Sequence, residues 1–151
     1  MDDEGNAVHL LLVEDSPADV YLVREAMKTE GLECRLQVAE DGEMAIQILN
    51  RVDAETDPAP NLLLVDLNVP RRDGIQVLQR MRQSPRYAGI PVIVISSSDS
   101  QADRERALAM GATEYFRKPS TLDEFMKLGR LVRTLHSRSG LRHEGGLVST
   151  V

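Results

Sequence analysis

Short runs of branched apolar residues alternate along the chain with longer segments of helical period. The runs at residues 8–13, 61–66 and 91–95 contain unbroken apolar stretches such as LLLV and VIVI. Unbroken stretches of this kind are typical of parallel strands that helices cover on both faces. The run at residues 34–38 instead alternates apolar and polar positions, which predicts a strand at the edge of the sheet. Residues 113–116 supply a fifth predicted strand.

The segments between these runs carry the signals of helices. Ser16, Pro17 and Asp19 have the character of an N-cap, a first-turn proline and an acidic third position. Thr121 and Glu124 form a capping box ahead of the last helix. The remaining three predicted helices span residues 44–49, 74–82 and 100–110.

The alternation of strands and helices predicts an α/β fold, with a doubly wound sheet of five parallel strands and five helices. Right-handed crossovers leave few arrangements for such a chain, and the flavodoxin-like strand order 2-1-3-4-5 is one of the common ones. The pattern alone does not choose between these orders. The motifs described below favour the flavodoxin-like order.

The length of 151 residues fits one domain of ordinary size. We expect a folded domain over residues 1–136 with a long polar loop at residues 51–60, a stretch that contains two prolines. The residues after His136 lack periodicity and include three glycines, so the sequence predicts a disordered tail at residues 137–151.

Composition limits the cellular compartments and the classes of binding partner that are consistent with the sequence. A formal net charge of −6 disfavours direct nucleic-acid binding, which depends on basic side chains. Cys34 is the single cysteine and cannot form an intramolecular disulfide, which indicates a reducing compartment. The amino terminus is acidic, and its apolar run ends at Glu14, far short of the roughly 20 residues of a membrane span. We therefore expect a soluble cytoplasmic protein without membrane association.

Polar side chains stand at the carboxyl ends of the predicted strands. Glu14 and Asp15 follow the first strand, Asp66 closes the third, Ser96 follows the fourth and Lys118 follows the fifth. Open α/β sheets bind ligands at this edge, where the strand order reverses. Three carboxylates in one crevice repel each other unless a cation joins them, and oxygen ligands favour Mg²⁺ together with a phosphate. The pattern predicts a Mg²⁺ site that receives a phosphoryl group.

Asp66 is the candidate nucleophile of this site. A carboxylate can form an aspartyl-phosphate intermediate, and Asp66 closes a strand that ends at the predicted crevice. Phosphoryl transfer asks mainly for positioning and charge neutralisation, which Mg²⁺ and the ammonium of Lys118 would provide. The hydroxyl of Ser96 would donate a hydrogen bond to a phosphoryl oxygen.

Four segments resemble the signature regions of response-regulator receiver domains of the CheY-like kind, in the same order and at similar spacing. The resemblance covers residues 8–135, and its motifs are VEDSPAD, VDLNVPRRDG, VIVISSSD and GATEYFRKP. The 51–60 loop and the stretch DLNVPRRDG further resemble the branch of single-domain regulators that partner phytochrome-type histidine kinases. The aromatic-rich end that is common in that branch is missing here.

The resemblance implies a role for each motif residue. Glu14 and Asp15 would hold the metal with Asp66, the phosphoacceptor, and the backbone carbonyl of Asn68. Ser96 would be the switch hydroxyl and Lys118 the lysine that meets the phosphoryl group. The family also implies that Tyr115 changes rotamer on activation and that the peptide bond between Lys118 and Pro119 is cis.

The function that follows from the resemblance is a signalling switch of a two-component system or phosphorelay. A histidine kinase or phosphotransfer protein would supply the phosphoryl group, and Mg²⁺ would be the cofactor. With no output domain expected after residue 135, the signal would pass to a downstream protein target, and a homodimer stays open. The chain would not be an enzyme, apart from slow self-phosphorylation from small donors and slow self-dephosphorylation.

Two other classes share parts of this pattern. A flavodoxin-like flavin carrier needs a neutral or glycine-rich loop after the first strand, whereas EDSPAD would repel an unaccompanied phosphate. Phosphatases with an aspartyl nucleophile generally carry a second aspartate two residues later, and here position 68 is asparagine. Both classes are therefore less consistent with the sequence than a receiver.

Overall fold

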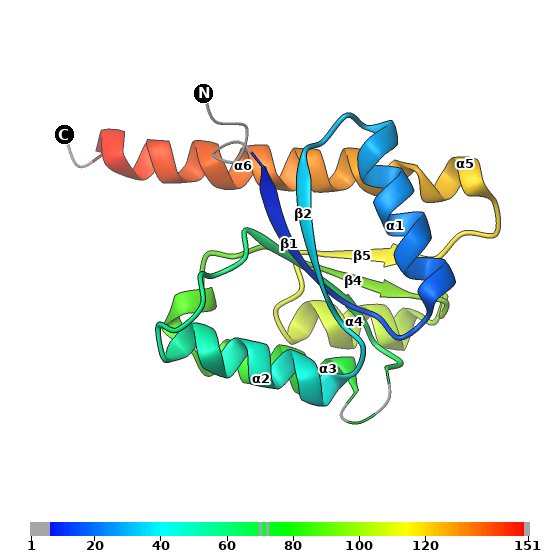
Figure 1. Ribbon diagram of the computed structural model, residues 1–151, viewed down its shortest axis with the longest axis horizontal. Helices are drawn as coiled ribbons and strands as arrows, with labels where there is room; N and C mark the ends of the chain where they lie inside the picture. Colours follow the sequence, from blue (N-terminus) through cyan, green and yellow to red (C-terminus); the bar gives the residue numbers. More distant parts are fainter. Residues whose placement is uncertain (1–6, 70, 72, 150–151) are drawn as a thin grey trace.

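One parallel sheet forms the centre of the computed structural model (Figure 1), which describes residues 7–69, 71 and 73–149, with side chains of the last helix described as far as residue 138. The strand order is β2-β1-β3-β4-β5, which confirms the predicted flavodoxin-like arrangement. The strands are β1 (Val8–Val13), β2 (Cys34–Ala39), β3 (Leu62–Asp66), β4 (Val92–Ser96) and β5 (Glu114–Arg117).

Helices cover both faces of this sheet. The helical elements are α1 (Pro17–Thr29), α2 (Gly42–Asp53), α3 (Gly74–Arg82), the 3-10 helix η2 (Pro85–Tyr87), α4 (Gln101–Ala109), α5 (Leu122–Phe125) and α6 (Lys127–Ser149). The helices α1, α5 and α6 lie on one side, and α2, α3 and α4 lie on the other (Figure 1). Within the described part of the chain, no helix is both long enough and apolar enough to cross a membrane.

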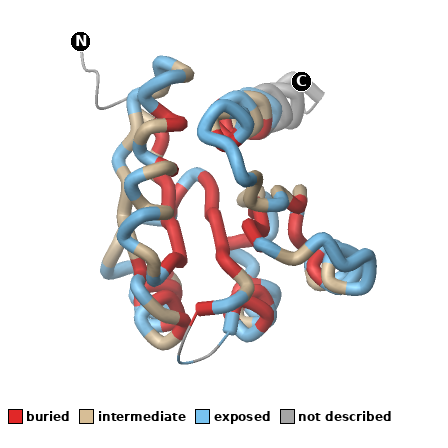
Figure 2. Tube along the Cα trace, turned by 90° about the vertical axis from the view of Figure 1, so that its right-hand side faces the viewer, coloured by how far each residue is buried: buried red, intermediate tan, exposed pale blue. Residues whose placement is uncertain are grey.

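The unbroken apolar strands divide their side chains between these two layers. In β1, Leu10 and Leu12 belong to the core beneath α1 and α6, whereas Leu11 and Val13 belong to the core beneath α2 and α3. Successive side chains of a strand point to opposite faces, so the part of a strand that is covered on both sides is apolar at consecutive positions, as from Leu10 to Val13. Buried residues accordingly run along the central strands between the helices (Figure 2).

The second helix is longer than the sequence predicted. Helix α2 continues to Asp53, so the connection to β3 begins three residues later than the predicted 51–60 loop. Tertiary contacts explain the extension, because the carboxylate of Asp53 accepts hydrogen bonds from Arg80 of α3 and from Ser84. These contacts stabilise the last turn of α2 against α3.

The predicted fifth helix is divided at Met126 into α5 and α6. Helix α6 then approaches α1 closely at Gly129, where a Cβ atom would collide with the backbone oxygen of Ala26. Arg133 adds a bond on the same side, since its Nε lies 2.9 Å from an oxygen of Glu30 at the end of α1. The close approach requires glycine, and it places the start of α6 firmly against α1.

Helix α6 extends over most of the segment for which the sequence predicted a tail. The helix continues as far as Ser149, where an irregular chain from residue 137 was predicted. The segment has no proline to interrupt the helical hydrogen bonds, although its three glycines lower the helix propensity. Leu135 is the last buried side chain described on α6. The mobility of residues 137–151 stays a prediction.

Candidate functional site

Three carboxylates meet at the carboxyl ends of β1 and β3, as the strand pattern predicted. Oxygen atoms of Glu14, Asp15 and Asp66 all lie within 4.8 Å of one another. Glu14 and Asp66 are buried, with 2% and 4% of their surfaces exposed, whereas Asp15 is exposed. The strands β1 and β3 are neighbours in the sheet, which brings their ends together. This group of oxygen ligands could hold a divalent cation.

Lys118 extends from the end of β5 into the same crevice. Its Nζ donates to Glu14 Oε1 at 3.2 Å and to Asp66 Oδ2 at 2.8 Å. A third bond of 2.7 Å joins Nζ to Asp19 Oδ2 on the first turn of α1. The backbone of Lys118 is fixed as well, because its N–H donates to the carbonyl of Ser96 at 2.7 Å. All three N–H groups of the ammonium therefore have a carboxylate partner.

Burial and charge shift the titration of this cluster. Burial raises the pKa of Glu14 to about 7, the charge of Asp66 adds to this rise, and the Ser16 N–H and Lys118 oppose it. Burial alone would lower the pKa of Lys118, but its hydrogen bonds to Asp19 and Asp66 raise that pKa above its ordinary value. The ammonium of Lys118 thus faces the carboxylates of Glu14, Asp19 and Asp66, which water screens only partly. A cation bound by the acidic group would further relieve the repulsion between its carboxylates.

Asp66 is held at both of its oxygens. Its Oδ2 contacts Lys118, and its Oδ1 accepts the backbone N–H of Asn68 at 2.8 Å. The connection after Asp66 passes close to the start of α3, where a Cβ on Gly74 would lie 2.7 Å from the Asp66 carbonyl oxygen. Asn68 is exposed, and its backbone N–H is the group that contacts Asp66. The role of its backbone carbonyl as a metal ligand, which the family resemblance implies, stays a prediction.

The two predicted switch residues are connected through Ser98. Ser96 closes β4, is only 1% exposed, and its Oγ accepts the Ser98 N–H at 3.1 Å. Tyr115 is buried in β5, and its hydroxyl donates to the Ser98 carbonyl at 3.0 Å. Arg104 of α4 lies over the tyrosine ring, 4.9 Å from its centroid. Ser98 could not be selected from the sequence, because nothing distinguishes it among the four serines of SSSDS.

Asp19 is the second residue of the site that was not predicted from the sequence. Its expected role was in a helix cap, and its N–H does donate to the Oγ of Ser16 at 3.3 Å. Its carboxylate, however, turns to Lys118. No local signal selects this role, because Asp15 precedes the N-cap Ser16 and the helical spacing rule does not relate it to Asp19.

Comparison with known proteins assigns the family. The sequence model of the family described as response regulator receiver domain matches residues 10–129 of the chain. This chain belongs to the response-regulator receiver family. The receiver domain is 37% identical to the response regulator Rcp1 of Synechocystis sp. over 130 residues, which cover 85% of this chain and 88% of Rcp1.

Two solved structures show the same arrangement of the chain. The Mn²⁺-bound form of response regulator Rcp1 has 34% identity and a TM-score of 0.74, with 84% of this chain and 92% of that chain covered. The phosphorylated cyanobacterial phytochrome response regulator RcpA has 28% identity and a TM-score of 0.74, with 83% and 91% covered. These similarities confirm the receiver fold.

One feature that the family resemblance implied is not found in this receiver domain. The peptide bond between Lys118 and Pro119 is trans, and no cis bond occurs elsewhere among the described residues. The trans form is the lower-energy form of most bonds that precede proline. With this trans bond in place, Lys118 contacts the carboxylates of Glu14, Asp19 and Asp66.

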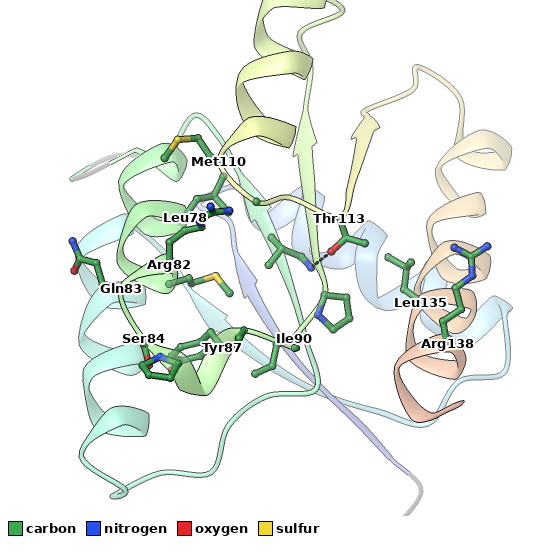
Figure 3. A pocket seen from close by; sticks show the side chains of 17 residues that line it. Leu78, Arg82, Gln83, Ser84, Tyr87, Ile90, Met110, Thr113, Leu135 and Arg138 are labelled. Carbon is green, nitrogen blue, oxygen red and sulfur yellow. Dashed lines mark hydrogen bonds between the residues drawn. The ribbon is translucent and has the colours of Figure 1, made fainter. Parts of the chain in front are cut away.

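A cavity of about 570 Å³ lies at the opposite end of the sheet from the carboxylates, near the starts of β4 and β5. Leu78, Arg82 and Tyr87 lie on one side of this cavity, and Leu135 and Arg138 lie on the other (Figure 3). None of the acidic residues of the crevice and no part of Lys118 lines this cavity. The crevice at the strand ends is the candidate site for phosphate chemistry because the carboxylates and Lys118 meet there.

Proposed function

We propose that this receiver domain is a phosphorylation-dependent switch that accepts a phosphoryl group on Asp66. One observation carries the proposal: Asp66 is a buried carboxylate that lies among the acidic group and touches Lys118 at 2.8 Å. A structural aspartate has no need of such neighbours, since burial beside like charges is costly. The family and the fold are those of signalling receivers, which supports the same reaction.

In the proposed reaction an oxygen of Asp66 attacks the phosphorus of a phosphohistidine. The P–N bond to the donor breaks, its electron pair stays on the imidazole nitrogen, and an acyl phosphate forms on Asp66. Lys118 contacts the attacking carboxylate, and its ammonium would then neutralise negative charge on the phosphoryl oxygens. Later a water molecule attacks phosphorus, the bond to Asp66 breaks, and inorganic phosphate leaves. We propose no other catalysis for this chain.

The acidic group supplies the ligands that a hard divalent cation requires. Glu14, Asp15 and Asp66 would hold Mg²⁺, which would neutralise charge on the transferred phosphoryl group. Asn68 would add its backbone carbonyl, as the family resemblance implies. The similar structure of Rcp1 is a Mn²⁺-bound form, which supports a divalent cation in this crevice.

Removal of Asp15 is expected to weaken cation binding more than removal of Glu14. Asp15 is exposed and free to turn toward a cation, whereas Glu14 already accepts hydrogen bonds from Lys118 and the Ser16 N–H. Loss of a direct carboxylate ligand should raise the dissociation constant for Mn²⁺ roughly tenfold or more, or at least about 1.4 kcal/mol. Titration of Asp15→Ala and Glu14→Ala with Mn²⁺, followed by electron paramagnetic resonance, measures both constants. Parental affinity in both variants would place the metal elsewhere.

The partners follow from the same chemistry. A histidine kinase or a histidine phosphotransfer protein is the proposed donor, in a two-component system or phosphorelay of the cytoplasm. The similar RcpA is a phytochrome response regulator, which makes a phytochrome-type kinase the first donor to test. We propose that the signal then passes to a downstream protein, or to a second copy of this chain.

Beryllofluoride provides the direct test of the switch, because it occupies the place of a phosphoryl group on an aspartate. With Mg²⁺ present, it should raise the melting temperature of the chain and shift amide resonances near Asp66 and Tyr115. Excess chelator should reverse both effects. If beryllofluoride with Mg²⁺ changed neither the melting temperature nor the amide resonances, the proposal would be contradicted. Pull-downs with and without beryllofluoride would then identify the partner.

Ser96→Ala is expected to separate phosphorylation from its conformational result. The variant keeps Asp66 and Lys118, and so should still accept a phosphoryl group. It lacks the Oγ that holds the Ser98 N–H, and thereby the link to Tyr115. Amide shifts induced by beryllofluoride should fall to less than half in β5 and α4. Shifts equal to those of the parent across these elements would show that Ser96 does not couple the site to Tyr115.

A further inference from the structure

Asp19 differs from the other carboxylates that contact Lys118. Glu14 and Asp66 belong to the group whose oxygens could hold a cation, and both would turn lone pairs toward it. Asp19 lies outside that group, yet it makes the shortest of the three contacts with Nζ, at 2.7 Å. Its carboxylate is partly buried at the first turn of α1, so water screens this contact less than it would screen a surface ion pair.

Binding of a divalent cation would change the balance of forces on Lys118. The cation repels the ammonium, and it draws on the charge of Glu14 and Asp66, which weakens their attraction for Nζ. The bond to Asp19 would be the contact that such binding leaves intact. An ammonium with one donor fixed in this way can present its other two donors to a phosphoryl oxygen and to Asp66.

We infer that Asp19 is the positioning residue of Lys118, which holds the ammonium at the crevice when a cation is bound and so supports phosphoryl transfer to Asp66. This inference rests on the proposed function. Asp19 acts through Lys118 and needs no contact with the phosphoryl group. The geometry that carries it is the Nζ to Oδ2 contact, together with the place of Asp19 outside the acidic group.

The capping role of residue 19 is separate from this contact. The cap uses the backbone N–H of Asp19 as the donor to Ser16 Oγ, and the carboxylate takes no part in that bond. Substitution by asparagine therefore keeps the cap and the side-chain volume but removes the charge. Glu124 supplies a matched control, because it is the acidic residue at the same third position of α5, and its carboxylate contacts Thr121 instead of Lys118.

A double-mutant cycle tests the inference with the full chain. The rate of adduct formation is measured at saturating Mg²⁺ over a range of acetyl phosphate, for the parent, Asp19→Asn, Lys118→Ala and the double variant. Asp19→Asn should lower the saturating rate roughly tenfold, equivalent to about 1.4 kcal/mol, with little change in the half-saturating concentration. In the Lys118→Ala background, Asp19→Asn should have no further effect. Glu124→Gln should behave as the parent, and Lys118→Gln provides a second background if Lys118→Ala fails to fold.

The outcomes distinguish the inference from the function on which it rests. If Asp19→Asn lowered the saturating rate equally in the parent and in the Lys118→Ala variant, Asp19 would not act through Lys118. If Asp19→Asn left the rate of the parent unchanged, Asp19 would have no role in the reaction. Either result overturns the inference and leaves Asp66 as the acceptor. A parent chain that gains no adduct would overturn the proposed function, and the role of Asp19 with it.

Discussion

Asp66→Asn is expected to abolish phosphorylation of the chain by acetyl phosphate and Mg²⁺ while the fold remains intact. The amide of asparagine lacks the anionic oxygen that attacks phosphorus, so no acyl phosphate can form at this position. Its volume is close to that of aspartate, and its oxygen can still accept a hydrogen bond from Lys118 or from the Asn68 N–H. Intact-mass measurement should find one phosphoryl adduct on the parent and none on the variant.

Asp99→Asn is the control for this experiment. Asp99 is an exposed aspartate at the same edge of the sheet, and it lies 3.8 Å from the guanidinium of Arg117. The control should gain the adduct at the parental rate, and circular dichroism should show the same helix content for all three proteins. An adduct of equal yield on Asp66→Asn would move the acceptor to another residue.

Gly74→Ala is expected to produce a large loss of stability. A Cβ at this position would lie 2.7 Å from both the Asp66 carbonyl oxygen and the Leu67 Cα, which are backbone atoms and cannot rotate away. Forcing an added methyl group into such a contact typically costs about 1–3 kcal/mol of unfolding free energy. Because the displaced backbone carries Asp66, the rate of phosphorylation should fall as well. Urea denaturation and the acetyl phosphate assay measure the two effects.

Gly89→Ala is the matched control for the same substitution. At Gly89 a Cβ would meet no described atom within 4 Å. Its unfolding free energy should lie within about 0.5 kcal/mol of the parental value, as for ordinary surface changes. If both glycine variants lost stability equally, the conformational freedom of glycine in general, and not the contact with the Asp66 backbone, would be responsible.

The strand ends were predictable because two strong constraints act on them. The part of a strand that helices cover on both faces is apolar throughout, so the first polar residue after that apolar run marks the strand end, as at Glu14 and at Asp66. Parallel strands then bring their carboxyl ends to one edge of the sheet. Both constraints leave their mark in the local sequence, and together they were enough to predict that the carboxylates and Lys118 share one crevice.

Other features depend on contacts between segments far apart in the chain. The bond from Asp19 to Lys118 joins residues 99 positions apart, and the local sequence around Asp19 is fully explained by a helix cap. The extension of α2 to Asp53 depends likewise on Arg80 and Ser84. The form of the segment after residue 137 was not predictable, because glycine-rich sequence without proline is compatible with both helix and coil.

The position of Ser98 between the two switch residues has an evolutionary consequence. Ser96 and Tyr115 bond to the backbone N–H and carbonyl of this residue, groups that nearly every amino acid shares. The side chain of Ser98 has different partners, since its Oγ donates to Asp103 of α4 at 2.7 Å and accepts the Ser100 N–H at 3.0 Å. Substitutions at position 98 would therefore alter how strongly the loop is tied to α4, while the backbone bonds from this residue to Ser96 and Tyr115 persist. The attachment of this loop to α4 is thus free to vary in evolution without any change at Ser96 or Tyr115.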